Sequence, residues 1–188
     1  SYGADMVSHG VDGTYGVAIN IHRNPFGGRN YEYYSEDPKL TGYLASEAVK
    51  GITNMGRNTF VKHFAVAQTE TGRDSLYTWL SEQAFREIYL EGFRIVVEEG
   101  QTTALMTSYN RVGALWAGGS TALLTGVLRN EWGFNGTIIT DYSDFNQYMN
   151  LDETLRAGGD LGMAVGLSFD INSTNRIKQR AKDAVKHT

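Results

Sequence analysis

The side chains that could carry chemistry follow strand-like runs of apolar and β-branched residues. Asp141 ends an Ile-Ile-Thr run. Lys62 and His63 end a second run, and Tyr109 ends a third. Arg29 lies in the loop after a further run. Because the carboxyl ends of parallel strands lie on one rim of a sheet, we expect these groups to converge. Cations close to Asp141 would keep it ionised, as a nucleophile or general base requires.

Other chemistries find less support in the sequence. Cysteine is absent, which excludes disulfides, thiolate nucleophiles and zinc–thiolate sites. Neither a G-x-S-x-G nucleophile elbow nor a Walker-type phosphate loop occurs. A metal-dependent hydrolase that uses His63 and Asp141 stays open as a weaker alternative, because these two residues lack any local metal-binding spacing.

The elements that must position these groups alternate along the chain. The predicted strands cover residues 16–21, 59–64, 103–109, 137–141 and 159–163. The predicted helices cover residues 38–51, 80–99, 120–131, 145–156 and 173–187. Residues 1–15 are polar and glycine-rich, so we expect an irregular N-terminal segment followed by one domain over residues 16–188.

Five strand-then-helix units predict an α/β fold with a parallel sheet and right-handed crossovers. A closed eight-stranded barrel usually needs about 250 residues, so five units are too few for it. The pattern leaves two architectures open, which are an open doubly wound sheet and a piece of a barrel.

The net charge of the chain limits the classes of partner that it can bind. A net charge of −4 and a pI near 5.6 argue against nucleic acid or an anionic membrane as the main partner. The sequence contains no apolar run long enough to span a bilayer. Nothing in the composition assigns a cellular compartment.

Several motifs occur in an order that resembles glycoside hydrolase family 3. The most specific is RNPFGGRNYEYYSEDP at residues 23–38, which resembles the signature loop of that family. The further matches are KHF at 62–64, Glu70 with Arg73, MTSYN at 106–110, RNEWGF at 129–134 and Thr140-Asp141. The resemblance covers about residues 16–163.

The resemblance implies an incomplete (β/α)8 TIM-type barrel and a retaining glycoside hydrolase of β-glucosidase type, acting on terminal β-linked glucose or a similar sugar. It implies that Asp141 is the catalytic nucleophile. Tyr142 stands where the family usually carries Trp. The residues that would bind the sugar or line its pocket are Arg29, Lys62, His63, Arg73, Met106, Tyr109 and Tyr142. The implied partner is a carbohydrate substrate, and neither a metal nor a cofactor is implied.

Two parts of the family's machinery have no counterpart in these residues. Retaining hydrolysis needs a second carboxyl as acid/base, about 5–5.5 Å from the nucleophile. In this family a Glu from a separate α/β sandwich domain usually supplies it, and that domain and the first barrel strands are both missing. We therefore expect a fragment that is nearly inactive alone, with open barrel edges that could self-associate. The alternative is a non-catalytic sugar-binding or assembly module derived from the same family.

The same residues also have ordinary structural interpretations. Arg29 could pin its loop by pairing with Glu32 or Glu36. Asp144 is a second candidate carboxylate, but we interpret it as the N-cap of a helix that begins near residue 145. Composition alone favours core or solvated-loop roles for Arg73 with Glu70, for Met106 and for Tyr109.

Overall fold

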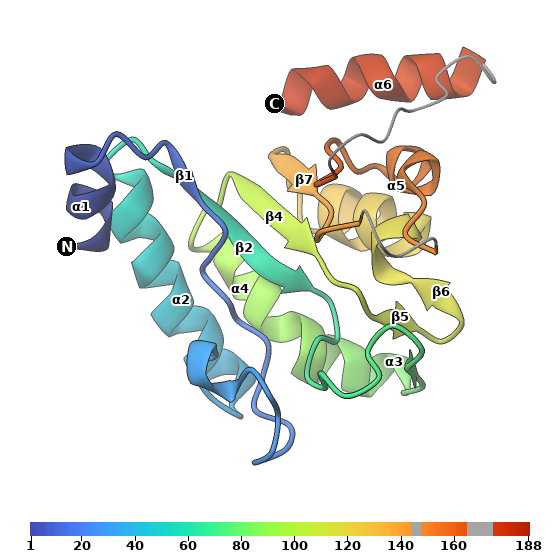
Figure 1. Cartoon of the computed structure of the whole chain (residues 1–188), viewed down its shortest axis with the longest axis horizontal. Coiled ribbons are helices and arrows are strands. Elements are labelled where there is room, and N and C mark those ends of the chain that lie inside the picture. The colour runs from blue at the N-terminus through green and yellow to red at the C-terminus, as the bar shows by residue number, and fades with distance from the viewer. Residues whose placement is uncertain (144–147, 165–174) are drawn as a thin grey trace.

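The computed structural model describes residues 1–143, 148–164 and 175–188 (Figure 1). Its central sheet has four parallel strands in sequence order: β1 (Gly13–Thr14), β2 (Asn58–Phe64), β4 (Ala104–Thr107) and β7 (Thr137–Ile139). An isolated parallel bridge between Ile139 and Leu161 marks a fifth strand position. Within the described residues β1 and β7 are not hydrogen-bonded to each other, so the sheet stays open. This arrangement confirms the predicted parallel α/β fold of about five units, an open and incomplete barrel.

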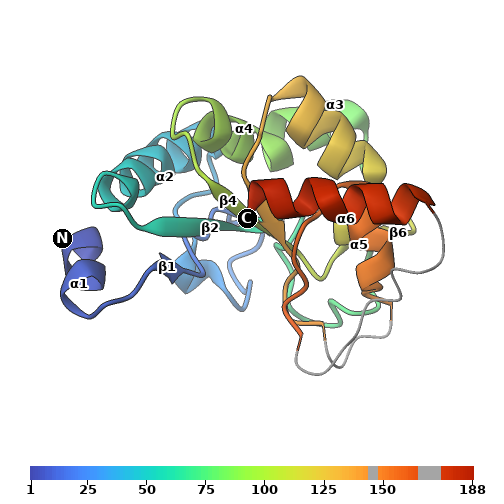
Figure 2. The same ribbon diagram turned by 90° about the horizontal axis from the view of Figure 1, so that it is seen from above.

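Helices cover one face of this sheet. They are α2 (Pro38–Thr53), α4 (Glu91–Glu98) and the π-helical segment η4 (Ala122–Glu131), which lie together above the strands in Figure 2. The main core forms between these helices and the strands, with Val61, Leu105 and Ile138 each at 1% exposure or less. Because side chains alternate along a strand, Lys62 and Met106 point to the opposite face, which is the inside of the open barrel.

Local signals explain where the helices begin and end. The Asp37 side chain accepts hydrogen bonds from the amides of Lys39 and Leu40, and Pro38 occupies the first helical position of α2. Ser81 caps the short helix α3 (Glu82–Ala84), which continues through the π-helical segment η2 (Phe85–Leu90) into α4. The long helix predicted over residues 80–99 is therefore present, but it has an irregular middle.

The prediction of an irregular segment over residues 1–15 is wrong. These residues form helix α1 (Tyr2–Ser8) and strand β1. Helix α1 buries Gly3 and Met6, and a Cβ added to Gly3 would lie 2.8 Å from the Gly51 carbonyl oxygen of α2. The contact face of α1 thus consists of one glycine and one methionine, too little apolar surface to produce a helical pattern in the sequence.

Two predicted elements start or end elsewhere. The strand expected over residues 16–21 forms only a bridge between Ala18 and Lys62, because this edge segment has a strand on one side only. The helix expected from residue 145 begins at Leu151 as α5 (Leu151–Ala157), where the Asn150 side chain accepts from the Asp152 amide. Asp144, interpreted as the cap of that helix, lies outside the described residues.

The sequence patterns did not predict a second, smaller sheet. It joins β3 (Tyr77–Thr78), β5 (Arg111–Val112) and β6 (Leu115–Trp116), with β3 and β5 parallel and β5 and β6 antiparallel. This sheet brings together the loops that follow β2 and β4. The short 3-10 helices η1 (Asn30–Glu32) and η3 (Ala117–Gly119) lie in the loops at the same rim.

Helix α6 (Asn175–His187) is the last element of the chain. Its His187 ring contacts the Asp160 carboxylate, with Nδ1 at 2.9 Å from Oδ1. Arg129 also binds Asp160, at 2.7 Å, so this buried carboxylate connects η4, α6 and the segment after α5. Among the helices of the described residues, none combines the length and the apolar character needed to cross a membrane.

Candidate active site

Asp141 lies at the carboxyl end of β7 and is 7% exposed. Its Oδ1 accepts a hydrogen bond of 2.8 Å from the Tyr142 amide. Its Oδ2 is buried and has no hydrogen-bond partner among the described residues. A buried carboxylate oxygen without a partner is costly, which is typical of an oxygen reserved for a substrate.

His63 approaches that unpaired oxygen from the neighbouring unit, with Nε2 at 3.7 Å from Asp141 Oδ2. The ring is 2% exposed, and Asn20 holds its backbone from both sides. The His63 amide donates to Asn20 Oδ1 at 2.8 Å, and Asn20 Nδ2 donates to the His63 carbonyl at 3.0 Å. These two bonds orient the Asn20 amide group.

The orientation of Asn20 in turn assigns the tautomer of His63. Asn20 Oδ1 lies 3.3 Å from His63 Nδ1 and can only accept a hydrogen bond. The proton therefore sits on Nδ1, and Nε2 faces the site as a hydrogen-bond acceptor. Two acceptors, Nε2 and Asp141 Oδ2, thus lie 3.7 Å apart, and a ligand hydroxyl beside them could donate its proton to one of the two.

Two cations, Arg29 and Lys62, share the carboxylate of Glu32. Arg29 Nε hydrogen-bonds to Glu32 Oε1, and Lys62 Nζ lies 3.4 Å from Glu32 Oε2. The three side chains are 15–20% exposed, so they face a partly open surface. Of the two predicted partners of Arg29, the structure selects Glu32.

A third cation, Arg73, contacts both Glu70 and Tyr109. Arg73 Nη1 binds Glu70 Oε2 at 2.7 Å, and its guanidinium carbon lies 4.0 Å from the centroid of the Tyr109 ring. This stacking interaction joins the loop after β2 to the loop after β4. Arg73 is therefore fixed at the rim by two contacts and is not a freely solvated loop residue.

Burial shifts the pKa values of Asp141 and His63 in opposite directions. Burial raises the pKa of the Asp141 carboxyl above its ordinary value, while the Tyr142 amide and the charges of Arg29, Arg73 and Lys62 oppose this rise. Burial also lowers the pKa of His63 well below its ordinary value, and the same three cations act in the same direction. Burial thus disfavours the charged form of both groups, and it leaves His63 as a neutral imidazole.

Tyr109 completes the surroundings of the carboxylate. Burial and the negative charge of Asp141 raise the pKa of the Tyr109 hydroxyl to about 12, so it stays protonated and can donate a hydrogen bond. Met106 is 2% exposed in the middle of β4, on the face opposite the helix-covered core. Tyr142 is half-buried directly after Asp141. All eight predicted site residues therefore lie on this face or rim of the sheet.

Sequence patterns did not assign Asn20, Tyr33 or Tyr148 to this site, and they named Glu32 only as a partner for Arg29. Asn20 and Glu32 act through contacts with residues about thirty to forty positions away, as the Asn20–His63 bridge shows. Tyr33 lies edge-on to the His63 ring and donates its hydroxyl to the Ala67 carbonyl at 2.9 Å. Only the RNPFGGRNYEYYSEDP motif, which contains Glu32 and Tyr33, offered a signal for any of them.

The loop after β2 carries a strained residue. Val66 has a φ of 61°, a left-handed conformation that β-branched residues rarely adopt. The bond from Tyr33 and a hydrogen bond of 2.6 Å from the Ser108 hydroxyl to the Ala65 carbonyl hold the loop on either side. Such strain persists only where the surroundings enforce it, and it is concentrated at functional sites.

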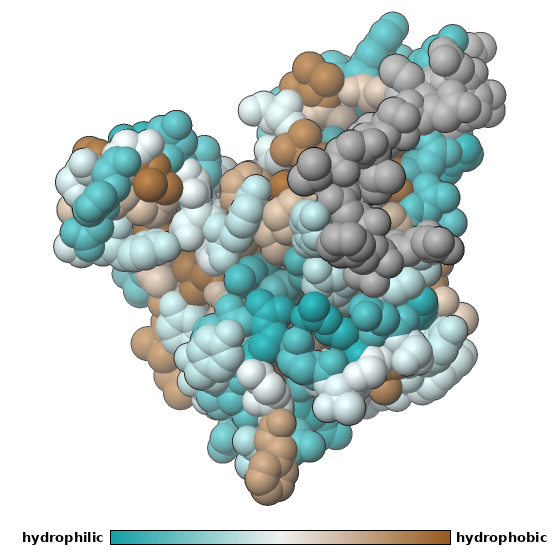
Figure 3. Space-filling model, in the orientation of Figure 1, coloured by the Kyte–Doolittle hydropathy of each residue, from teal (hydrophilic) through white to brown (hydrophobic). Residues whose placement is uncertain are grey.

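Hydrophilic side chains gather over this rim. Figure 3 shows them in the middle of the face seen in Figure 1, over the carboxyl ends of β2 and β4. In the described part of the chain, no group of three His, Cys, Asp or Glu side chains is placed to hold a metal ion. The arrangement of donors and acceptors suits a ligand with several hydroxyl groups, because charged donors bind hydroxyls with strong, directional bonds.

Comparisons with known proteins agree with this geometry. A family model described as the glycosyl hydrolase family 3 N terminal domain matches residues 1–187. The chain is 44% identical to a β-glucosidase of Ruminococcus albus over 140 residues, which make up 74% of this chain and 15% of that protein. It is 43% identical over 127 residues to an exo-α-(1→6)-L-arabinopyranosidase of Bifidobacterium longum, covering 68% of this chain and 17% of that protein.

A solved structure of similar fold is the β-glucosidase of Kluyveromyces marxianus in complex with glucose. It superposes with a TM-score of 0.89 at 30% identity, over 98% of this chain and 24% of that one. The matched region thus spans less than a quarter of each of these relatives. The family match also includes residues 1–15, so it extends further than the motifs alone indicated. The chain belongs to glycosyl hydrolase family 3.

Proposed function

We propose that these residues form the nucleophile half of a retaining β-glycosidase that acts on terminal β-linked glucose or a similar sugar. The observation that carries the proposal is the buried Oδ2 of Asp141, which has no hydrogen-bond partner among the described residues and is surrounded by cations and a neutral imidazole. The names of the relatives support a glycosidase, since they include β-glucosidases and an arabinopyranosidase.

The proposed reaction uses Asp141 in two steps. Its Oδ2 attacks the anomeric carbon, the bond to the leaving-group oxygen breaks, and a glycosyl ester forms. A proton from a second carboxyl reaches the leaving oxygen in this step. In the next step the same second group takes a proton from water, the water oxygen attacks the anomeric carbon, and Asp141 is released as a carboxylate.

The surrounding groups hold the sugar. Arg29, Lys62 and Arg73 can donate hydrogen bonds to hydroxyls, and each is already oriented by a carboxylate. His63 Nε2 can accept a bond from a hydroxyl that would otherwise face Asp141 directly. Preorganised donors and acceptors of this kind lower the cost of orienting a flexible, many-hydroxyl ligand. Met106, Tyr109 and Tyr142 would contact the same sugar from the face and rim that carry Asp141.

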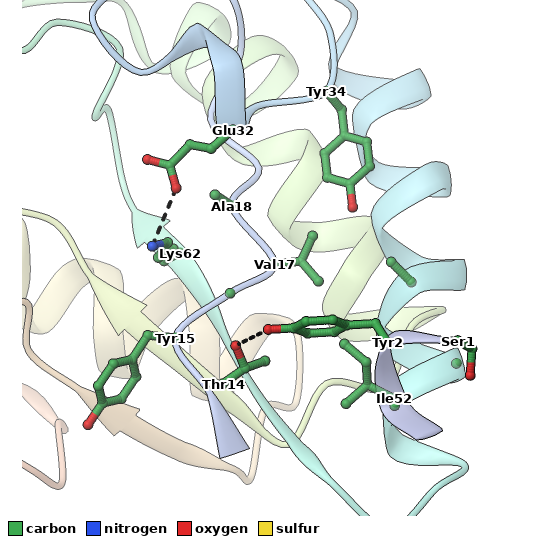
Figure 4. Close-up of a pocket in the computed structure, with 14 residues that line it drawn as sticks. Ser1, Tyr2, Thr14, Tyr15, Val17, Ala18, Glu32, Tyr34, Ile52 and Lys62 are labelled. Atoms are coloured by element: carbon green, nitrogen blue, oxygen red, sulfur yellow. Dashed lines mark hydrogen bonds and ion pairs between the residues drawn. The ribbon is translucent and has the colours of Figure 1, made fainter. Parts of the chain in front are cut away.

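The edge of the sheet beside this site is open. The edge segment at residues 13–18 pairs with β2 on one side only, as far as the described residues extend. An open pocket of about 530 Å³ lies beside it, between α1 and α2, with Tyr2, Val17 and Ile52 on its walls (Figure 4). The Glu32–Lys62 ion pair lies at one end of this pocket. We propose that additional barrel strands cover the pocket, supplied by a longer parent chain or by a second copy.

Trapping with a fluorinated sugar tests the nucleophile directly. A 2-deoxy-2-fluoro-β-glucoside with an activated leaving group needs no acid to form the glycosyl ester, and its fluorine slows hydrolysis of that ester. Intact mass spectrometry should detect one adduct, and peptide mapping should locate it on Asp141. The variant Asp141→Asn serves as the control and should stay unmodified. An adduct on another residue would contradict the assignment, and sugar binding without any adduct would favour the non-catalytic module.

Light scattering coupled to gel filtration tests the completion of the barrel. If a second copy covers the open edge, the 188-residue chain should elute as a dimer. A monomer that binds no sugar, together with activity in a longer protein that contains these residues, would assign the missing strands to the longer chain.

A further inference from the structure

Exposed aromatic rings lie in and directly after β3, in the small sheet that joins the loops after β2 and β4. Trp79 is 76% exposed and Tyr77 is 51% exposed. A single exposed apolar side chain needs no explanation, whereas a group of exposed aromatic rings can mark an interaction site. Both follow Arg73 within one loop, and that loop also supplies the cation that stacks on Tyr109.

A series of direct contacts connects Tyr77 to Tyr109. Tyr77 pairs with Arg111 across β3 and β5, and the Arg111 guanidinium carbon lies 5.0 Å from the centroid of the Tyr77 ring. The same carbon lies 3.8 Å from the centroid of the Tyr148 ring. The Tyr148 hydroxyl donates to the Tyr109 carbonyl at 3.0 Å. Tyr77 is therefore connected to Tyr109 through two intermediate side chains.

Trp79 is held from below by a glycine. Gly113 has a φ of 57°, and a Cβ built on it would lie 3.4 Å from the Trp79 ring. The Gly113 amide donates to the Thr78 carbonyl at 2.8 Å, which keeps the two segments together. One side of the indole thus rests on the turn between β5 and β6, while most of the ring remains accessible.

We propose that Tyr77 and Trp79 form the surface that binds the leaving-group side of the glycoside, and that they select leaving groups that carry a ring. The inference rests on the proposed function, because it needs the sugar to occupy the pocket at Asp141. Fixed aromatic rings suit this task since their electron-rich faces attract the C–H groups of a sugar ring or the edge of an aryl ring. They also lose little conformational freedom on binding.

The competing occupant of this surface is another part of a longer protein. An aromatic patch at a rim can pack against a neighbouring domain. In that case removal of Trp79 would destabilise the protein and lower kcat/KM for every substrate by the same factor. Binding of a leaving group would instead change only the preference between substrates.

Kinetics in the full-length protein that contains these residues distinguish the two. The substrates are phenyl β-glucoside, whose leaving group is a ring, and methyl β-glucoside, whose leaving group is not. Trp79→Ala should lower kcat/KM for the phenyl glycoside by about three- to tenfold, as expected for the loss of one stacking contact. It should leave methyl β-glucoside and inhibition by free glucose unchanged, and Trp79→Phe should retain most of the preference.

The ratio of the two kcat/KM values is independent of how much of each preparation is folded, so a poorly folding variant still gives a readable result. Tyr43→Ala, which removes an aromatic that is 50% exposed on α2, is the matched control and should leave the ratio unchanged. An unchanged ratio in Trp79→Ala would overturn the inference while the proposed function stands. Absence of Asp141-dependent turnover of both substrates would overturn both.

Discussion

Removal of the Asn20 side chain tests whether the Asn20–His63 hydrogen bonds hold the site together. Asn20 is 1% exposed and bridges both backbone groups of His63, which is itself 2% exposed. Asn20→Ala leaves a buried N–H and a buried C=O without partners, and each such group costs about 1–3 kcal/mol. Partial entry of water into the vacated space offsets part of this cost, so we expect the free energy of unfolding to fall by about 2–4 kcal/mol.

Urea unfolding of the 188-residue chain, followed by far-UV circular dichroism, measures this change. The midpoint should fall while the slope of the transition stays the same, because the surface exposed on unfolding is unchanged. Asn54→Ala provides the matched control, since Asn54 is exposed at the end of α2 and should shift stability by less than about 0.5 kcal/mol. A loss below about 1 kcal/mol for Asn20→Ala would refute the bridging role.

The same variant also tests how His63 is oriented. Without Asn20 Oδ1, the His63 ring loses the contact that assigns its proton to Nδ1. Formation of the fluoro-sugar adduct at Asp141 should then slow by about tenfold or more, because small displacements of positioning groups have large effects on reaction rates. An adduct that forms at the original rate in a destabilised Asn20→Ala would show that the bridge serves stability alone.

Four further variants extend these tests. Burial raises the pKa of Asp141 above its value in the unfolded chain, so ionisation of Asp141 opposes folding. The variant Asp141→Asn should therefore form no adduct, and at pH 7 it should unfold at a higher urea concentration than the original chain. This gain in stability should vanish as the pH falls below the unfolded pKa of Asp141. Arg73→Met removes a charge that lowers the pKa of Asp141, so the acidic limb of the kcat/KM profile should move to higher pH; no movement would mean that Arg73 does not act on the carboxylate. Gly51→Ala in α2 should raise the free energy of unfolding by about 0.4–1 kcal/mol because its Cβ would meet nothing within 4 Å. Gly136→Ala should destabilise the chain by more than about 2 kcal/mol, since its Cβ would lie 2.1 Å from the Thr103 carbonyl oxygen, and thermal unfolding of both glycine variants checks the contrast.

The sequence predicted those elements whose signal is local. The strands near β2 and β7 are buried apolar runs, and α2 begins at the predicted Asp37-Pro38 signal. Helix α1 was not predicted, because its buried face consists of a glycine and a methionine. The small sheet was not predicted, because each of its strands is two residues long and too short to show an alternating pattern.

The site was predictable in its residue types but not in its contacts. The motif resemblance named Asp141, His63 and the cations, because these residues lie in recognisable segments. The bridge from Asn20 to His63 depends on strand register across 43 positions, which no local pattern encodes. The cation–π contacts of Arg73 and Arg111 likewise depend on how two loops meet.

The ion pairs at the rim have a consequence for the kind of ligand that can enter. The positive charges of Arg29, Lys62 and Arg73 are matched one for one by Glu32, Glu70 and Asp141, and the neutral His63 adds nothing. Balanced charges leave little net field to attract or repel ions, so an uncharged molecule should enter at a rate that hardly depends on ionic strength. Esterification of Asp141 would remove one negative charge and leave the cleft with a net charge of +1, which would favour the approach of the electron-rich water oxygen that must release the sugar.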